Sequence, residues 1–211
     1  MSNRFIAIEG NIGAGKTSLA RLLANELNAQ LILEQFEKNS FLPLFYKEPQ
    51  RYAFPLEMSF LADRYQQLKS KLSSPELFQS TIVADYFISK SLIFARKTLQ
   101  DDEYKLYSKL FSIISSSLRK PDLLVYLFSD IPRLRENIRN RGRDYEQEID
   151  NEYLEKIQSS YFEFIHNHSN MAIVIIDNSK LDFVNKEEDF AKLKEIIMQK
   201  HSHGIHRYTL E

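Results

Sequence analysis

The chain has 211 residues, of which 43% are hydrophobic and 27% are charged, and its formal net charge is -1. This near-neutral balance excludes a general attraction to nucleic acid or to an anionic membrane surface. The absence of cysteine excludes disulfides, thiolate metal sites and cysteine nucleophiles. The first apolar run begins at residue 4 and no apolar run approaches about 18 residues. We therefore expect one cytoplasmic domain without a signal peptide or membrane span.

The first predicted element is a strand, Phe5–Ile8, followed by a glycine-rich segment and a helical pattern. The segment matches G-x-x-x-x-G-K-[ST], whose glycines let backbone N–H groups turn inward around a phosphate. In this pattern Lys16 reaches the β- and γ-phosphates, and the Thr17 hydroxyl binds Mg²⁺. The alternative is a structural turn with a surface lysine. The motif predicts that ATP is bound by Gly10, Asn11, Ile12, Gly13, Ala14, Gly15, Lys16, Thr17 and Ser18.

Apolar, β-branched runs alternate with longer helical patterns along the rest of the chain. They predict five strands, at Arg4–Glu9, Leu31–Glu34, Thr81–Asp85, Leu123–Phe128 and Met171–Asp177. Connections of this length contain crossover helices, so we expect an α/β fold with a five-stranded parallel sheet flanked by helices. The histidine-containing tail after residue 200 is expected to be polar and solvated.

Three acidic residues stand at the carboxyl ends of predicted strands, where open α/β sheets bind their ligands. Glu34 could accept the proton of an attacking hydroxyl, and a solvated acid is the alternative. Asp85 closes an apolar strand as in a Walker B element, which suits binding of Mg²⁺ or its water. Asp130 competes for this role, but Ile131 and Pro132 follow it and indicate a helix cap.

Five arginines lie between residues 133 and 143. Gly142 interrupts the helical pattern and places Arg141 and Arg143 on a flexible segment. Such a segment is suited to a lid, at about residues 139–150, whose planar guanidinium groups hold the oxygens of a transferring phosphoryl group. A solvated basic face or a nucleic-acid patch is the alternative.

Four segments together resemble the deoxynucleoside kinases of the deoxycytidine/deoxyguanosine kinase type, and bacterial deoxyadenosine kinases most of all. They are Glu9–Ser18, Phe45–Phe54, Arg64 and Arg141–Gln147, in the same order and spacing. The resemblance covers nearly the whole chain. It implies one P-loop kinase domain over residues 1–211 that transfers the γ-phosphate of ATP, with Mg²⁺, to a deoxynucleoside 5′-hydroxyl in nucleotide salvage.

The resemblance also assigns residue roles. The catalytic residues it implies are Glu34 as general base, Lys16, Arg141 and Arg143. Tyr46 and Glu146 match the pair that holds the sugar 3′-hydroxyl, Glu57 and Arg64 match positions that read the base, and Phe54 and Phe87 are candidate stacking walls. The implied substrate-binding residues are Glu34, Tyr46, Phe54, Glu57, Arg64, Asp85 and Glu146. The segment from Asp182 to Phe190 resembles the loop that passes over the ATP adenine, with Asp189 and Phe190 as ATP-binding residues, and Thr17 and Asp85 would hold the metal.

The chain departs from the family pattern after the third predicted strand. Relatives have an acid followed by arginine and serine, whereas Tyr86 and Phe87 follow Asp85 here. The arginine expected near the 5′-hydroxyl and the phosphates is therefore absent, and Arg64 or a lid arginine would have to replace it.

A second departure concerns the base. Glu57 stands where relatives have glutamine. An ionised carboxylate offers only acceptors, which suits the two donors of guanine, whereas adenine also presents an acceptor. The whole-chain resemblance and a nearby Arg64 that turns the carboxylate favour adenine. We therefore expect purine deoxynucleosides as substrates, deoxyadenosine ahead of deoxyguanosine, with a deoxyguanosine or broad-specificity kinase as the alternative.

The stretches Phe54–Leu72 and Leu106–Leu118 carry more apolar and aromatic side chains than one helix face needs. Relatives pair through helices at about this place, so we expect a homodimer, with no nucleic-acid or membrane partner. Two other classes remain open. A nucleoside monophosphate kinase would need extra cations for the acceptor phosphate, and a regulator that hydrolyses nucleoside triphosphate slowly would not need a sugar clamp.

Overall fold

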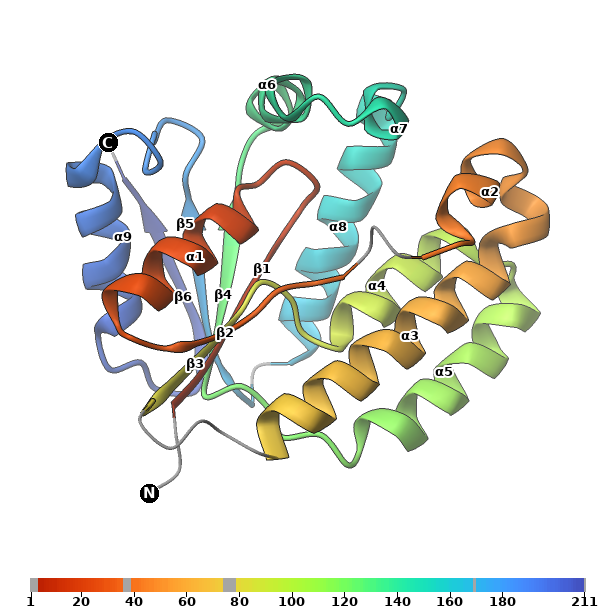
Figure 1. Ribbon diagram of the computed structural model, residues 1–211, viewed down its shortest axis with the longest axis horizontal. Coiled ribbons are helices and arrows are strands. Elements are labelled where there is room, and N and C mark those ends of the chain that lie inside the picture. Colours follow the sequence, from red (N-terminus) through yellow and green to blue (C-terminus); the bar gives the residue numbers. More distant parts are fainter. Residues whose placement is uncertain (1–3, 36–38, 74–78, 169, 211) are drawn as a thin grey trace.

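A computed structural model describes residues 4–35, 39–73, 79–168 and 170–210 (Figure 1). Helices and strands alternate along these ranges. In chain order they are β1 (Arg4–Gly10), α1 (Lys16–Glu26), β2 (Gln30–Ile32), α2 (Leu42–Lys47), α3 (Pro49–Ser73), β3 (Thr81–Ala84), α4 (Ser89–Thr98), α5 (Asp101–Ser115), β4 (Leu123–Phe128), α6 (Ile131–Arg141), α7 (Asp144–Gln147), α8 (Asn151–Asn167), β5 (Ala172–Asp177), α9 (Glu187–Met198) and β6 (Gly204–Thr209).

The strands form one parallel sheet in the order β2-β3-β1-β4-β5-β6. The α/β class and the five predicted strands are confirmed, but the predicted strand number is wrong, because the described residues contribute six strands. The tail that was expected to be solvated supplies β6, which pairs with β5 from Gly204 to Thr209. This edge strand is half exposed and contains His206 and Arg207, so it lacks the continuous apolar run of a buried strand.

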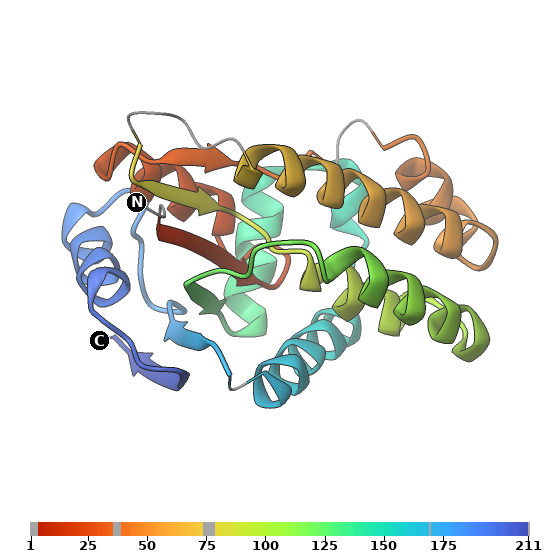
Figure 2. The same cartoon turned by 90° about the horizontal axis from the view of Figure 1, so that it is seen from below.

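Helices cover both faces of the sheet (Figure 2). In β1, Phe5 and Ala7 belong to an apolar cluster that includes residues of α3, α4, α5 and α8. Their neighbours Ile6 and Ile8 belong to a second cluster, with residues of α1, α6 and α9. Alternate residues of a strand point to opposite faces, so continuous apolar runs are what a sheet buried on both sides requires. In the described ranges, no helix has a stretch both long enough and apolar enough to cross a membrane.

The predicted lid follows α6. Asp130 caps this helix as predicted, since its carboxylate accepts a hydrogen bond from the Arg133 backbone N–H at 2.9 Å. Gly142 ends the helix with a left-handed φ of 70°, a conformation that glycine adopts without strain. The chain turns there, and the short α7 lies on the side of the molecule where the strands have their carboxyl ends (Figure 1).

Candidate active site

The loop between β1 and α1 has the backbone shape of a phosphate loop. Gly13 and Gly15 have φ values of 83° and 88°, which strongly favour glycine. A Cβ atom at Gly13 would lie 2.7 Å from the Leu134 carbonyl oxygen, so the position also lacks space for a side chain. Helix α1 begins at Lys16 without a side-chain cap or an acidic residue in its first turn. Its first N–H groups therefore have no partner within the helix and can meet an anion.

Side chains outside the loop hold it in place. The amides of Asn137 and Asn178 donate to the carbonyl oxygens of Gly13 at 2.8 Å and Ala14 at 3.1 Å. The Lys16 ammonium donates to the Asn11 carbonyl oxygen at 2.8 Å and so spans the loop. Burial and the neighbouring Lys90 lower the pKa of Lys16 to about 8. A bound polyphosphate would favour the charged form of Lys16, as is expected of a lysine in an anion-binding site.

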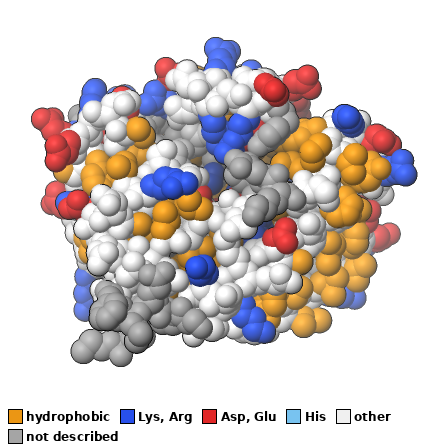
Figure 3. Space-filling model, viewed as in Figure 1, with side chains coloured by type: hydrophobic (Ala, Val, Ile, Leu, Met, Phe, Trp, Pro, Cys, Tyr) orange, Lys and Arg blue, Asp and Glu red, His pale blue; other side chains and the backbone are white. Residues whose placement is uncertain are grey.

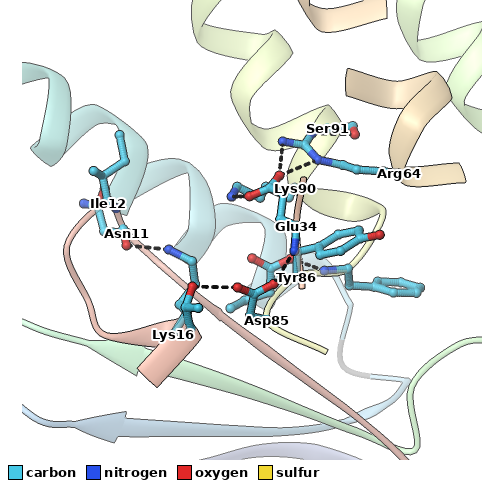
Figure 4. Close-up of polar contacts among 12 residues, drawn as sticks. Asn11, Ile12, Lys16, Glu34, Arg64, Asp85, Tyr86, Lys90 and Ser91 are labelled. Atoms are coloured by element: carbon cyan, nitrogen blue, oxygen red, sulfur yellow. Dashed lines mark hydrogen bonds and ion pairs between the residues drawn. The ribbon is translucent and has the colours of Figure 1, made fainter. Parts of the chain in front are cut away.

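Glu34 lies just beyond β2 and is held by two cations (Figure 4). Arg64 donates to Oε1 from Nε at 2.8 Å and from Nη2 at 2.7 Å, and Lys90 Nζ lies 2.5 Å from Oε2. Burial opposes ionisation of this side chain, which is 12% exposed, but Lys90 and Arg64 outweigh it and lower the pKa of Glu34 to about 2. The carboxylate is therefore ionised and fixed in direction at neutral pH.

Lys90 was not predicted as a site residue. It stands in the first turn of α4, five residues after Asp85, and its Nζ donates to Glu34 Oε2. Helix α4 also buries Ser89 and Ser91, so no apolar pattern in the sequence singled out Lys90. Arg64 was predicted to read the base, but its described contacts are with Glu34 and with the Ser91 hydroxyl, at 2.7 Å.

Asp85 connects the phosphate loop to Glu34. Its Oδ2 accepts from the Thr17 hydroxyl at 2.6 Å, and its Oδ1 accepts from the Glu34 backbone N–H at 2.8 Å (Figure 4). A hydroxyl and a carboxylate next to a phosphate loop are the hard oxygen donors that Mg²⁺ prefers. Thr17 and Asp85 are therefore the residues that could hold a metal ion beside bound phosphates.

A cavity opens next to Glu34, and we call it the acceptor cavity. Glu57, from α3, lines it and is 3% exposed; its Oε1 accepts from the Thr98 hydroxyl at 2.8 Å, and its Oε2 is buried without a hydrogen-bond partner among the described residues. Burial raises the pKa of Glu57 to about 7 against the opposing effects of Arg64 and Thr98. The other described lining residues are Ile12, Lys16, Thr17, Glu34, Leu42, Phe45, Tyr46, Leu56, Phe60, Arg64, Asp85, Lys90, Phe94, Thr98, Arg141, Arg143, Glu146 and Tyr153.

The predicted aromatic walls differ from those in the structure. Phe54 and Phe87 are not among the described residues that line the acceptor cavity. The Phe87 ring is buried in the core and meets the Phe5 ring edge-on, with centroids 6.1 Å apart. Aromatic side chains from four different helices line the cavity instead, and sequence spacing does not bring them together. They are Phe45, Phe60, Phe94 and Tyr153.

The lid arginines meet the predicted sugar-binding acid. Arg141 pairs with Oε2 of Glu146, and Arg143 Nη1 lies 3.2 Å from Oε1. Glu146 is buried, whereas Tyr46, the other predicted sugar ligand, is 41% exposed at the cavity wall. The structure thus brings Tyr46, Glu146 and both lid arginines to one cavity.

A second cavity lies at the phosphate loop, and we call it the donor cavity. It is lined by Gly13–Ser18, by α6 and the lid, and by residues 181–185. Asp189 and Phe190, which were predicted to lie over the ATP adenine, are not among its described lining residues. The Asp189 carboxylate instead accepts from the Asp182 backbone N–H at 2.9 Å and so shapes the 181–185 segment. Phe183 and Val184, which belong to the same predicted loop, line the cavity.

The donor and acceptor cavities share part of their walls. Four residues line both of them: Lys16, Thr17, Arg141 and Arg143. Three of these are cations, and in the acceptor cavity they share the lining with Glu34. A phosphoryl group passing from one cavity to the other would move through this cationic boundary, which is the arrangement that phosphoryl transfer requires.

Comparisons with known proteins agree with this geometry. A family model described as deoxynucleoside kinase matches residues 6–202 and ends before β6. A deoxyguanosine kinase of Bacillus subtilis (strain 168) is 36% identical over 202 residues, covering 92% of this chain and 98% of the relative. A deoxyadenosine kinase of Dictyostelium discoideum is 36% identical over 185 residues, covering 87% and 75%. A solved structure of deoxyadenosine kinase from M. mycoides with bound dATP has a TM-score of 0.80 at 22% identity, covering 93% of this chain and 100% of that one. The chain therefore belongs to the deoxynucleoside kinases, which are phosphotransferases.

Proposed function

We propose that the chain transfers the γ-phosphate of ATP to the 5′-hydroxyl of purine deoxynucleosides. The observation that carries this proposal is the cationic boundary between the two cavities, with Glu34 on its acceptor side. The triphosphate enters the donor cavity and rests on the phosphate loop. The deoxynucleoside enters the acceptor cavity with its 5′-hydroxyl at Glu34. The names of the two relatives reported above, deoxyguanosine kinase and deoxyadenosine kinase, support purine deoxynucleosides as the substrate class.

In this mechanism Glu34 accepts a hydrogen bond from the 5′-hydroxyl and takes its proton late. Its low pKa makes it a weak base in the empty site, but the attacking oxygen of a loose transition state keeps its proton until the phosphoryl group has largely moved. Arg64 and Lys90 fix the carboxylate while this happens. Lys16, Arg141 and Arg143 stabilise charge on the transferring group, and Mg²⁺ bound by Thr17 and Asp85 would neutralise part of the triphosphate charge.

The sugar and the base are bound farther from the boundary. Tyr46 and Glu146 hold the 3′-hydroxyl, and the ion pairs between Glu146 and the lid arginines rearrange when the sugar binds. Glu57 meets the base. Arg64 is engaged by Glu34 and Ser91, so it does not turn Glu57 toward a single hydrogen bond, which was the local reason to favour adenine. Guanine and adenine are therefore both candidates for this wall.

The nearest rival on the same scaffold is a nucleoside monophosphate kinase, which needs cations to hold an acceptor phosphate. Two buried cations of the acceptor cavity, Arg64 and Lys90, are already paired with Glu34. This pairing favours an uncharged acceptor hydroxyl over an acceptor phosphate, because a second anion at the same cations would lie close to Glu34.

A substrate panel tests the proposed function. We expect kcat/KM for deoxyguanosine and deoxyadenosine to exceed that for deoxycytidine and thymidine by about tenfold or more, the scale of one good hydrogen bond to a charged group. Radiolabelled nucleosides with ATP and Mg²⁺ give the four values. Equal or higher values for the pyrimidine nucleosides would contradict the purine assignment without affecting the kinase assignment.

We also propose that two copies of the chain pair through α5. Leu106 and Ile113 are 51% and 72% exposed, lie two helical turns apart and face away from the buried side of the helix. Apolar side chains gather over this side of the molecule (Figure 3). Two aromatic residues of the stretches that were predicted to pair lie elsewhere, since Phe60 lines the acceptor cavity and Tyr107 is buried in the core.

Light scattering tests the pairing. We expect twice the chain mass of 24.9 kDa at micromolar concentration, and the single-chain mass for Ile113→Glu, because a charge in an apolar interface is costly to bury. Met198→Glu is the matched control, since Met198 is also an exposed apolar side chain but lies at the end of α9, away from α5. A monomeric mass for the unaltered chain would refute the proposal.

A further inference from the structure

We propose that a proton on Glu57 selects the base: the ionised carboxylate favours guanine, and the protonated acid favours adenine. This inference rests on the proposed function, because it assumes that a purine occupies the acceptor cavity. It goes beyond that function because the base preference then depends on the protonation of one side chain and changes with pH.

The position of the carboxyl group supports this role. Oε1 of Glu57 accepts from the Thr98 hydroxyl, and Oε2 is buried without a hydrogen-bond partner among the described residues, in a residue that lines the cavity. Leaving a buried polar atom unsatisfied is costly, so a ligand that pairs with Oε2 gains more than it would at a solvated group. Both oxygens keep free lone pairs in the ionised state.

Thr98 can accommodate either state of Glu57. Its hydroxyl lies 2.8 Å from Glu57 Oε1 and 3.2 Å from the Phe94 carbonyl oxygen, and it has one hydrogen to donate. When Glu57 is ionised, the hydroxyl donates to Oε1. When Glu57 is protonated on Oε2, the hydroxyl still donates to Oε1, which is then the carbonyl oxygen, and the acid proton remains available to the base. The carboxyl group therefore keeps a hydrogen-bond partner when its proton number changes.

Burial outweighs the net effect of the charges around Glu57. Arg64 on its own helix and Lys90 on α4 favour the ionised form, but both are paired with Glu34, whose charge opposes them. On α5, the Tyr107 hydroxyl donates to the Glu57 backbone carbonyl at 3.4 Å, and Tyr153 on α8 is a second nearby phenol. Burial raises the pKa of both phenols, so they are neutral near pH 7. Burial also raises the pKa of Glu57 to about 7, where both of its forms are populated.

The two bases present different edges to this group. Guanine presents two donors, N1–H and its amino group, which match two carboxylate acceptors. Adenine presents an amino donor and a ring nitrogen acceptor, which match the carbonyl and hydroxyl of a protonated acid, as they match a glutamine amide. Deoxyguanosine binding therefore releases protons and strengthens as pH rises through about 7. Deoxyadenosine binding takes up protons and weakens over the same range.

Calorimetry in buffers of different ionisation enthalpy measures the number of protons released or taken up when a nucleoside binds. It needs no variant of the protein. Near pH 7, where Glu57 is about half protonated, we expect release of up to about half a proton with deoxyguanosine and uptake of up to about half a proton with deoxyadenosine. Opposite signs for the two nucleosides support the proposal. Equal proton numbers for both would overturn it. Failure of both nucleosides to bind would instead overturn the proposed function.

Kinetics with Glu57→Gln give the second readout. In the unaltered enzyme, the ratio of kcat/KM for deoxyguanosine to that for deoxyadenosine should rise about tenfold or more between about pH 6 and about pH 8. The ratio cancels titrations that affect both substrates alike. In Glu57→Gln the ratio should not change with pH. It should also favour deoxyadenosine more than in the unaltered enzyme, because the amide has one donor and one acceptor. A rise of the same size in both proteins would show that another group titrates, and a constant ratio in the unaltered enzyme would equally refute the proposal.

Discussion

Replacement of Glu34 by glutamine is expected to lower kcat by roughly 10²–10⁴, with little change in the KM for the deoxynucleoside. The amide keeps the shape of the side chain but cannot take the proton of the 5′-hydroxyl. It also removes the negative charge that Arg64 and Lys90 surround, so these two buried cations lose their counter-ion. Steady-state kinetics with saturating ATP and Mg²⁺ measure the effect, and thermal unfolding reports the loss of the ion pairs separately.

The matched control is Glu48→Gln, the same chemical change at an exposed glutamate between α2 and α3 that is not among the described cavity-lining residues. Its kcat should equal that of the unaltered enzyme. If kcat of Glu34→Gln were unchanged while the variant remained folded, Glu34 would have no part in the chemical step, and its ion pairs would be purely structural.

Replacement of Arg143 by alanine is expected to lower kcat by roughly 10²–10³ and to change deoxynucleoside affinity much less. Arg143 lines both cavities, so in the proposed mechanism its guanidinium meets the transferring phosphoryl group. The interaction grows as charge develops in the transition state, and its loss therefore affects kcat more than binding. Rapid-quench kinetics separate the chemical step from product release.

Arg139→Ala is the control for the lid. Arg139 lies in the last turn of α6, one turn before Arg143, but it is exposed and absent from the described lining of both cavities. Its replacement should leave kcat unchanged. If Arg143→Ala raised only the KM for the deoxynucleoside, the lid would belong to the acceptor pocket and not to the phosphoryl-transfer machinery.

The sequence predicted features that depend on a continuous segment. The phosphate loop requires glycines, a lysine and a hydroxyl at fixed spacing, so Gly13, Lys16 and Thr17 could be assigned before the fold was known. The buried strands were equally evident, because a parallel sheet covered on both faces needs continuous apolar runs. The edge strand β6 has one neighbour and a half-exposed pattern, so it leaves no such run in the sequence.

Features that depend on tertiary contacts could not be predicted in the same way. Lys90 and Arg64 lie on different helices and meet only because both reach Glu34. The environment of Glu57 depends on Thr98, 41 residues away in the sequence, and on the burial that α3 and α4 provide. The family resemblance indicated that position 57 reads the base, but the protonation state of Glu57 depends on the fold.

The most direct test of the proposed reaction is to follow where the terminal phosphate of ATP goes. ATP labelled in its γ-phosphate is incubated with Mg²⁺ and either deoxyguanosine or 2′,5′-dideoxyguanosine, which lacks the attacking hydroxyl. We predict labelled deoxyguanosine 5′-monophosphate in amounts equal to the ADP formed, and no labelled nucleoside product with the dideoxy compound. Release of free phosphate at the same rate with both compounds, without labelled nucleoside monophosphate, would show a triphosphate hydrolase and contradict the assignment of Glu34 and the acceptor cavity.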